Sequence, residues 1–145
     1  VQVIHNIFEQ TPEDVLYPLC QELDIGVIAR VPFDEGALTG TLRPGYVFAA
    51  DDWRASYFRD DRLDQLEERL VGLEATIAAF EPAATSIAET ALRFCLTHPA
   101  VSTVIPGMRS RERVEENVAV SDGRVLGPAD REALRAFAWE KNWYQ

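Results

Sequence analysis

The strongest chemical pattern in the sequence lies near its end, at Ile105–Asn117. An apolar run typical of a strand ends there, Gly107 follows, and Ser110 can cap the helix that the next residues predict. The first turn of a helix presents free N–H groups and positive partial charge, which attract phosphate groups. Arg109 stands immediately before this cap and can add a bidentate contact. The pattern therefore predicts a site for a phosphorylated ligand.

Three polar side chains of the same predicted helix share one face. Arg113, Glu116 and Asn117 are spaced i, i+3 and i+4. A cation, a carboxylate and an amide on one face can hold a phosphate and contact the polar edge of an adenine. An ordinary solvent-exposed helix with a serine cap would show the same residues, and the pattern alone leaves both interpretations equally open.

The elements that must hold these residues alternate along the chain. Apolar runs predict strands at Val1–Ile7, Gly26–Val31 and Val101–Ile105. Helical spacing predicts the remaining elements, which are Thr11–Leu23, Leu63–Ile77, Thr85–Leu96, Ser110–Val120 and a last helix from about Pro128. Such alternation indicates an α/β fold with parallel strands. A (β/α)₈ TIM barrel has eight strands in about 250 residues, and this chain supplies about three.

Two segments need a qualification. Pro18 lies inside the first predicted helix and removes a backbone hydrogen bond there, so we expect either a kink or a helix that begins after Thr11. The segment Pro32–Asp60 lacks a regular apolar period. A loop of that length inside a compact domain is usually functional.

Composition limits the possible partners. The net charge of −10 repels nucleic acid and anionic membranes, so we expect neither as a partner, and the late arginine cluster favours a small anionic ligand. Cys20 and Cys95 lie among apolar neighbours and are expected to be buried. Their spacing to His5 and His98 offers no zinc ligand set, so no metal is expected. Without a signal-peptide pattern or a bilayer-spanning apolar run, we expect a cytoplasmic protein.

The segment Ile105–Asn117 resembles the adenosine-phosphate motif of aldo-keto reductases, and other segments resemble that family in the same order. Val1–Phe8 is similar to its sixth barrel strand, and Gly26–Gly40 to its seventh strand and cofactor loop. Asp52–Arg54 falls where that loop folds over the pyrophosphate, and Ala91–Val101 resembles the helix and turn before strand eight. The resemblance implies that residues 1–145 form a partial domain, the C-terminal part of a (β/α)₈ TIM barrel with strands six to eight.

The resemblance also implies cofactor contacts at the nicotinamide and pyrophosphate. Gln2 would bond the nicotinamide carboxamide, and Arg30 would stack on its ring where the family usually has tyrosine or tryptophan. Pro32 and the backbone after it would line the pyrophosphate path with Leu38 packing nearby, and Arg54 would supply a phosphate contact. Structural roles are the alternative: backbone pairing for Gln2, an ion pair for Arg30 and solvation for Arg54.

At the other end of the cofactor, Gly107 and Arg109 would meet the adenosine phosphate. Arg113, Glu116 and Asn117 would surround the adenine. Two arginines at this position imply NADPH rather than NADH, because a 2′-phosphate favours bidentate cations.

No catalytic residue is expected in this chain. The family reduces carbonyls by hydride transfer from the nicotinamide, with a tyrosine acid, a lysine, an aspartate and a histidine from early barrel strands. Lys141 is the only lysine here and lies in the C-terminal tail. We therefore expect an NADPH-dependent reductase of small-molecule carbonyl substrates whose catalytic half lies outside the chain.

Two other interpretations stay open. One is a truncated domain that binds dinucleotide, or nothing, and persists as an oligomer. The other is a different phosphate-binding barrel, since such sites recur late in this fold. Exposed strand edges favour a homo-oligomer or pairing with the missing N-terminal half.

Overall fold

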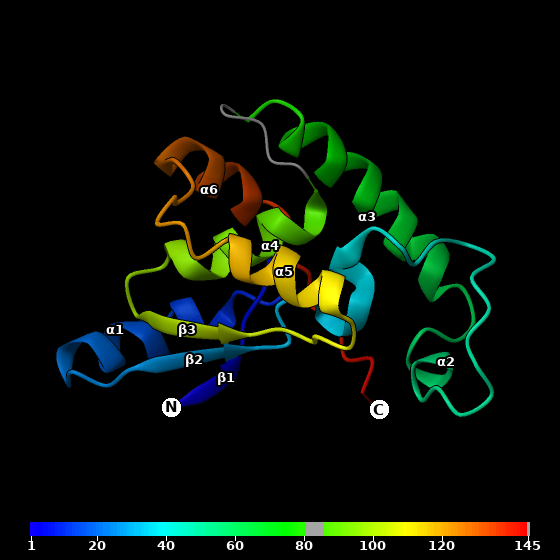
Figure 1. Cartoon of the computed structure of the whole chain (residues 1–145), viewed down its shortest axis with the longest axis horizontal. Helices are drawn as coiled ribbons and strands as arrows, with labels where there is room; N and C mark the ends of the chain where they lie inside the picture. Colours follow the sequence, from blue (N-terminus) through cyan, green and yellow to red (C-terminus); the bar gives the residue numbers. More distant parts are fainter. Residues whose placement is uncertain (81–85, 145) are drawn as a thin grey trace.

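The computed structural model describes residues 1–80 and 86–144, and its framework is a parallel three-stranded sheet (Figure 1). The strands are β1 (Gln2–Ile4), β2 (Val27–Arg30) and β3 (Val101–Ile105), and they are paired in chain order. The three predicted strands are therefore confirmed, although β1 is shorter than its apolar run.

The early end of β1 follows from the side chain of Asn6. Its Oδ1 accepts hydrogen bonds from the N–H groups of Phe8 and Glu9, each at 2.9 Å. Asparagine commonly turns the backbone by bonding the residues that follow it. Its Nδ2 also donates to the carbonyl oxygen of Val31 at 3.0 Å, which ties the end of β1 to the residue after β2.

The predicted helices occur in the predicted order, and α2 is a short helix that was not predicted. Their bounds are α1 (Leu16–Glu22), α2 (Arg54–Tyr57), α3 (Arg62–Ile77), α4 (Ile87–Thr97), α5 (Arg111–Ala119) and α6 (Pro128–Arg135), with the 3₁₀ segments η1 (Thr11–Glu13) and η2 (Asp34–Thr39). The Ser110 hydroxyl accepts from the N–H of Arg113 at 3.3 Å, so the predicted cap of α5 is confirmed. Ser86 caps α4 in the same way, while the expected start at Thr85 lies outside the described residues.

The first predicted helix begins later than Thr11. Because α1 starts at Leu16, Pro18 is its third residue. The backbone N–H groups of the first helical turn have no partner within the helix, so the helix loses no hydrogen bond to the proline. The alternative of a later start is therefore confirmed. Thr11 does not cap α1; it opens η1, and its hydroxyl bonds the carboxylate of Glu9 instead.

The segment Pro32–Asp60 is not a plain loop, because η2 and α2 lie within it. Backbone φ angles are positive at Val31 (56°), Asp34 (47°) and Glu35 (57°). Positive φ is a genuine outlier for a β-branched residue such as valine. Such strained conformations persist only where surrounding contacts hold them, and they cluster at functional sites.

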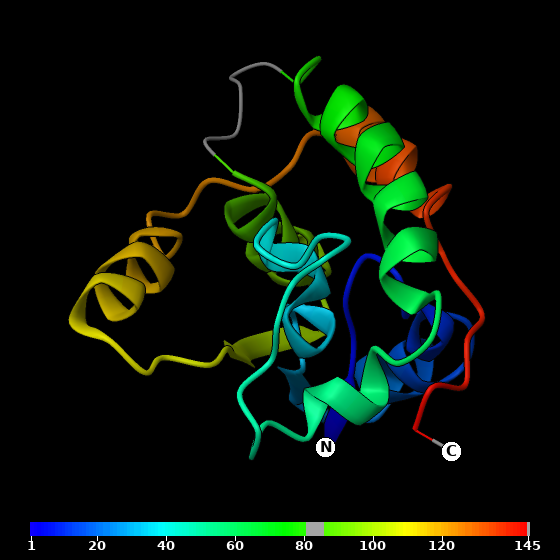
Figure 2. The same ribbon diagram turned by 90° about the vertical axis from the view of Figure 1, so that its right-hand side faces the viewer.

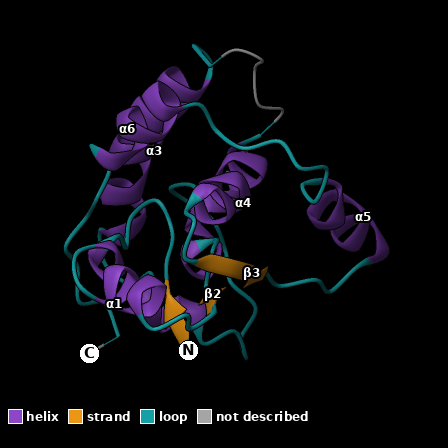
Figure 3. Ribbon diagram, turned by 90° about the vertical axis from the view of Figure 1, so that its left-hand side faces the viewer, coloured by secondary structure: helices purple, strands orange, loops and turns teal. Residues whose placement is uncertain are grey.

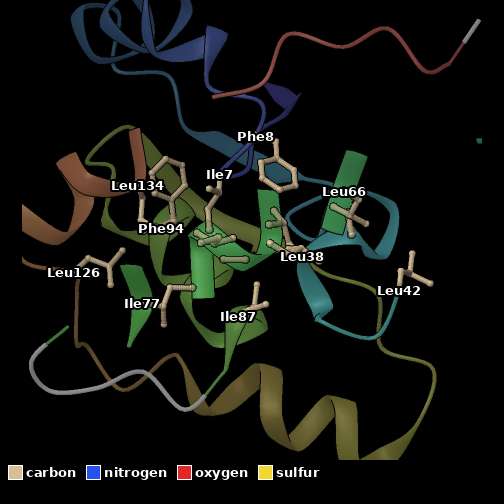
Figure 4. Close-up of a cluster of buried hydrophobic side chains, with 14 of the residues drawn as sticks. Ile7, Phe8, Leu38, Leu42, Leu66, Ile77, Ile87, Phe94, Leu126 and Leu134 are labelled. Atoms are coloured by element: carbon tan, nitrogen blue, oxygen red, sulfur yellow. The ribbon is translucent and has the colours of Figure 1, made fainter. Parts of the chain in front are cut away.

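The helices cover one face of the sheet, and the main core lies among them and η2. Its side chains include Ile7, Leu38, Phe94 and Leu134, all fully buried (Figure 4). Along β2 the burial alternates, so that Ile28 and Arg30 lie on the other face of the sheet. Helices α3 and α6 contact each other, and α5 stands on the opposite side of the molecule (Figures 2 and 3).

The remaining composition-based expectations concern cysteines, membranes and metals. Cys20 and Cys95 are buried free thiols, which confirms their predicted burial. Within residues 1–80 and 86–144, no helix combines the length and apolar character that crossing a bilayer requires. The same part of the chain gathers no set of His, Cys, Asp and Glu side chains that could hold a metal ion.

Candidate functional site

A cleft of about 710 Å³ opens at the carboxyl ends of β2 and β3. Its walls come from η2, from the segment that leads into α2, and from the β3–α5 connection. The cleft brings together most of the predicted site residues, namely Pro32, Arg54, Gly107, Arg109, Arg113 and Asn117. Ligands of parallel α/β sheets bind at this end of the strands.

The β3–α5 side of the cleft is built for close approach of a ligand. Gly107 is exposed, and no atom lies within 4 Å of the position that a Cβ on it would take. The connection is held by Asn117, which is 8% exposed and donates from Nδ2 to the Gly107 carbonyl oxygen at 3.3 Å. This bond fixes the glycine against α5, next to the free N–H groups of the first helical turn.

Two arginines on this side differ in their partners. Arg109 is exposed to the cleft and forms no ion pair with any described residue. Arg113 lines the cleft, and its Nη1 lies 2.6 Å from the carboxylate of Glu116. Glu116 itself does not line the cleft. Arg109 is therefore the guanidinium most available to an anion.

The opposite wall contains an ion pair that sequence reasoning did not predict. The guanidinium of Arg54 contacts the carboxylate of Asp52, with Nη2 2.6 Å from Oδ2. Hydrogen bonds from Arg54, helped by the nearby charge of Arg109, lower the pKa of Asp52 to about 2. Asp51 and Glu35 also line the cleft. Carboxylates are not expected beside a phosphate, so the residue types of Asp51 and Glu35 gave no signal for the site. The one available signal was their position in the Pro32–Asp60 segment.

The C-terminal tail holds the strained η2 wall from behind. The ammonium of Lys141 lies 2.7 Å from the carboxylate of Asp34, and both side chains are less than 10% exposed. Burial raises the pKa of Asp34, while Lys141 opposes that rise. The Tyr144 hydroxyl donates to the Glu35 carboxylate at 2.8 Å. The positive φ angles at Asp34 and Glu35 are thus stabilised by contacts from the tail.

The remaining predicted site residues lie outside this cleft. Gln2 is the cross-strand partner of Ile28, which points to the same sheet face as Arg30. Gln2 and Arg30 therefore share the face that the helices do not cover. Leu38 is fully buried in the main core, behind the wall rather than in its lining. Gln2 and Arg30 are accessible to a ligand, but the structure does not bring them into the cleft with the arginines.

Comparisons with known proteins point to one family. The family model named Aldo/keto reductase family matches residues 1–138. The chain is 30% identical over 131 residues to the uncharacterized oxidoreductase YqkF of Bacillus subtilis, covering 90% of this chain and 40% of that protein. It is 26% identical over 138 residues to the NADH-specific methylglyoxal reductase of Escherichia coli, covering 95% of this chain and 41% of that protein.

Solved structures give the same result. The apo form of aldo-keto reductase AKR11C1 from Bacillus halodurans is 25% identical, with a TM-score of 0.70, and the match covers 95% of this chain and 42% of that one. Glycerol dehydrogenase AKR11B4 from Gluconobacter oxydans is 24% identical, with a TM-score of 0.77 over 94% of this chain and 41% of that one. The chain spans about 40% of the length of the curated relatives that it matches. Its sequence and its α/β fold show that the chain belongs to the aldo/keto reductase family.

Proposed function

We propose that this chain supplies the dinucleotide-binding side of an NADPH-dependent aldo-keto reductase that acts on small-molecule carbonyl substrates. The cleft at the carboxyl ends of β2 and β3 carries this proposal, because it gathers Arg54, Arg109 and Arg113 around the open backbone at Gly107. Guanidinium groups bind phosphate with paired hydrogen bonds, and the first turn of α5 adds free N–H groups. Two of these cations lie on the β3–α5 side of the cleft and one on the opposite wall, an arrangement that suits a ligand with several phosphates.

The proposed contacts divide the cofactor along the cleft. Pro32 and Arg54 would face the pyrophosphate, with Leu38 supporting that wall from the core. Gly107 and Arg109 would face the adenosine phosphate. Bound NADPH would supply the hydride that reduces the carbonyl.

The two ends of the cofactor complete this assignment. The adenine would be surrounded by three residues of α5, namely Arg113, Glu116 and Asn117. Gln2 and Arg30 would reach the nicotinamide from the uncovered sheet face.

The proton donor of the reaction would come from outside residues 1–145. Lys141, the only lysine, is buried against Asp34 and cannot tune a catalytic tyrosine. We propose that the chain corresponds to strands six to eight of the barrel, and that the protein acts in the cytoplasm. Membership of the aldo/keto reductase family leaves no place for an unrelated phosphate-binding barrel.

Replacing Arg109 by alanine is expected to weaken NADPH binding about tenfold to a hundredfold, because hydrogen bonds to charged groups contribute about 1.5–3 kcal/mol. Titration of the purified chain followed by NADPH fluorescence measures this change. NADH, which lacks the 2′-phosphate, is expected to bind more weakly to the unaltered chain. Its affinity should also fall less than that of NADPH when Arg109 is replaced. Equal losses for both cofactors would contradict the 2′-phosphate role of Arg109. Failure of the unaltered chain to bind either cofactor would contradict the proposed function.

Arg111→Ala is the matched control for this titration. Arg111 also lies in the first turn of α5, but its Nε bonds Glu115 at 2.8 Å and it does not line the cleft. The substitution removes the same charge two residues away and is expected to change affinity about twofold at most. Methylglyoxal, the carbonyl named for the Escherichia coli relative, is a suitable first substrate, and the isolated chain should not turn it over.

We also propose that the exposed sheet is covered by association, either with another copy or with the missing barrel half. Residues of the uncovered face include Ile28 and Ile105, which are 36% and 47% exposed. Unpaired strand edges favour pairing with another chain. Sedimentation velocity of the isolated chain is expected to reveal dimers or larger species, and a single monomeric boundary at all concentrations would refute this expectation.

A further inference from the structure

The cleft proposed for the dinucleotide carries balanced charge before any ligand enters. Its lining contains three arginines and three carboxylates, which are Arg54, Arg109, Arg113, Glu35, Asp51 and Asp52. A guanidinium binds a phosphate strongly only when its N–H groups are free to form paired hydrogen bonds. Any carboxylate already bonded to one of these arginines therefore opposes anion binding.

One such pair has the geometry of a bound anion. The Nε of Arg54 lies 3.0 and 3.1 Å from the two carboxylate oxygens of Asp52, and its Nη2 lies 2.6 Å from Oδ2. The backbone N–H of Arg54 donates to Oδ1 at 3.0 Å. The two side chains are 21% and 19% exposed. Asp52 thus occupies the paired N–H donors that a guanidinium offers to a phosphate.

The position of Arg54 is fixed by the surrounding wall. Its Nη1 lies only 3.1 Å from the point that a Cβ on Gly36 would occupy, so the glycine leaves room for the guanidinium. Its charge also lies over the ring of Phe48, with Cζ 5.7 Å from the ring centre. These contacts hold the guanidinium at the cleft.

The other charged groups of the cleft are arranged differently. Arg113 is paired with Glu116, which lies outside the lining, and Arg109 has no ion-pair partner among the described residues. Asp51 lines the cleft without forming an ion pair to any described residue. Within residues 1–80 and 86–144, Asp52 and Arg54 form the ion pair whose two partners both line the cleft.

We propose that the carboxylate of Asp52 occupies the place of a phosphate on Arg54, and that a pyrophosphate group binds this wall only by displacing it. This inference rests on the proposed function, because it assigns the displaced contact to the pyrophosphate of a dinucleotide. Asp52 is therefore an affinity-determining residue that weakens the binding of anions to the cleft.

Displacement rather than protonation must open the pair. Hydrogen bonds from Arg54 keep the pKa of Asp52 near 2, so the carboxylate stays charged at any pH near neutrality. A ligand with several phosphate oxygens can replace the contacts that Arg54 loses, whereas a neutral ligand cannot. The pair thus selects for ligands with strong anionic groups.

The test is Asp52→Asn in the full chain. Asparagine keeps an Oδ1 that can accept from the N–H of Arg54, but it lacks the charge that binds the guanidinium. The variant is expected to bind NADPH about tenfold more tightly in a fluorescence titration, since charge-assisted hydrogen bonds are roughly twice as strong as neutral ones. The affinity for inorganic pyrophosphate, measured by isothermal titration calorimetry, should rise by a similar factor. General loss of structure cannot produce tighter binding.

Asp51→Asn is the matched control, because it removes the same charge from the same cleft without touching Arg54. It is expected to change either affinity by about twofold at most. In an Arg54→Ala background, Asp52→Asn should give no gain, because the competing contact is already absent. Asp52→Ser provides a second way to remove the carboxylate and should also bind more tightly.

The outcomes separate the inference from the function on which it rests. Equal gains in Asp51→Asn and Asp52→Asn would mean that diffuse charge controls the affinity, and this would overturn the inference. Binding by the unaltered chain with no gain in Asp52→Asn or Asp52→Ser would overturn the inference alone. Failure of every variant to bind either NADPH or pyrophosphate would overturn the proposed function together with the inference.

Discussion

Replacement of Lys141 by alanine is expected to lower the free energy of unfolding by about 3–5 kcal/mol, the range seen when one partner of a buried ion pair is removed. Lys141 and Asp34 are 8% and 7% exposed, and their charged atoms are 2.7 Å apart. Without Lys141, the Asp34 carboxylate would stay buried with no opposite charge beside it. Urea unfolding followed by circular dichroism measures the change.

The aromatic surroundings of Lys141 add to this effect. Its ammonium lies 5.0 Å from the ring centre of Phe8, 4.8 Å from that of Trp139 and 5.3 Å from that of Trp143. Each aromatic face attracts a cation, most strongly where water is excluded. The single lysine therefore joins the tail to both the core and the η2 wall.

The pH dependence of this variant distinguishes a lost charge from lost packing. Burial already raises the pKa of Asp34, and removal of Lys141 should raise it further. A protonated Asp34 needs no counter-charge, so the stability deficit of Lys141→Ala should shrink as the pH falls. Lys141→Met combined with Asp34→Asn, a neutral pair of similar volume, should recover most of the stability. A deficit below about 1 kcal/mol at neutral pH would show that the pair contributes little.

The sequence allowed the prediction of regular elements wherever a local pattern decides them. The Ser110 cap and the strand Val101–Ile105 depend on neighbours in sequence, and both are confirmed. Thr11 failed as a cap signal because Pro12 and Glu13 form a short 3₁₀ turn, and the α-helix begins only at Leu16. A good capping residue does not decide which of two nearby starts the chain uses.

The site was predicted on its basic side and missed on its acidic side. Arg109 and Arg113 follow a strand within a recognisable segment, so their meeting at one cleft could be anticipated. Asp52 pairs with Arg54 through a short turn that no periodic pattern marks. Lys141 reaches Asp34 across more than a hundred residues, and only the folded chain brings them together.

A separate buried group should make the stability depend on pH. His5 is fully buried at the end of β1, and desolvation lowers its pKa from 6.5 to about 4. Its ring stacks on Phe94 and meets Tyr17 edge-on. Glu13 favours its protonation, while His98 and Arg131 oppose it. The folded protein therefore keeps His5 neutral under conditions where the unfolded chain protonates it.

The sign of the effect follows from this difference. Above pH 6.5 both states hold a neutral His5, and its contribution to stability is fully present. As the pH falls from 6.5 toward 4, the unfolded chain takes up a proton that the folded protein refuses, so stability is lost. A shift of this size corresponds to a loss of about 3 kcal/mol, which is complete near pH 4.

Two measurements test the contribution of His5. The NMR signal of its imidazole ring should titrate near pH 4, well below the ordinary histidine value. In His5→Phe, an aromatic ring still packs against Phe94, and the fall in unfolding free energy between pH 6.5 and 4 should be smaller than in the unaltered chain. His98→Phe is the comparison: its side chain is less buried than that of His5, so the slope should change less. If His5→Phe keeps the full slope, the acid sensitivity arises elsewhere, and the buried imidazole is only a packing element of the core.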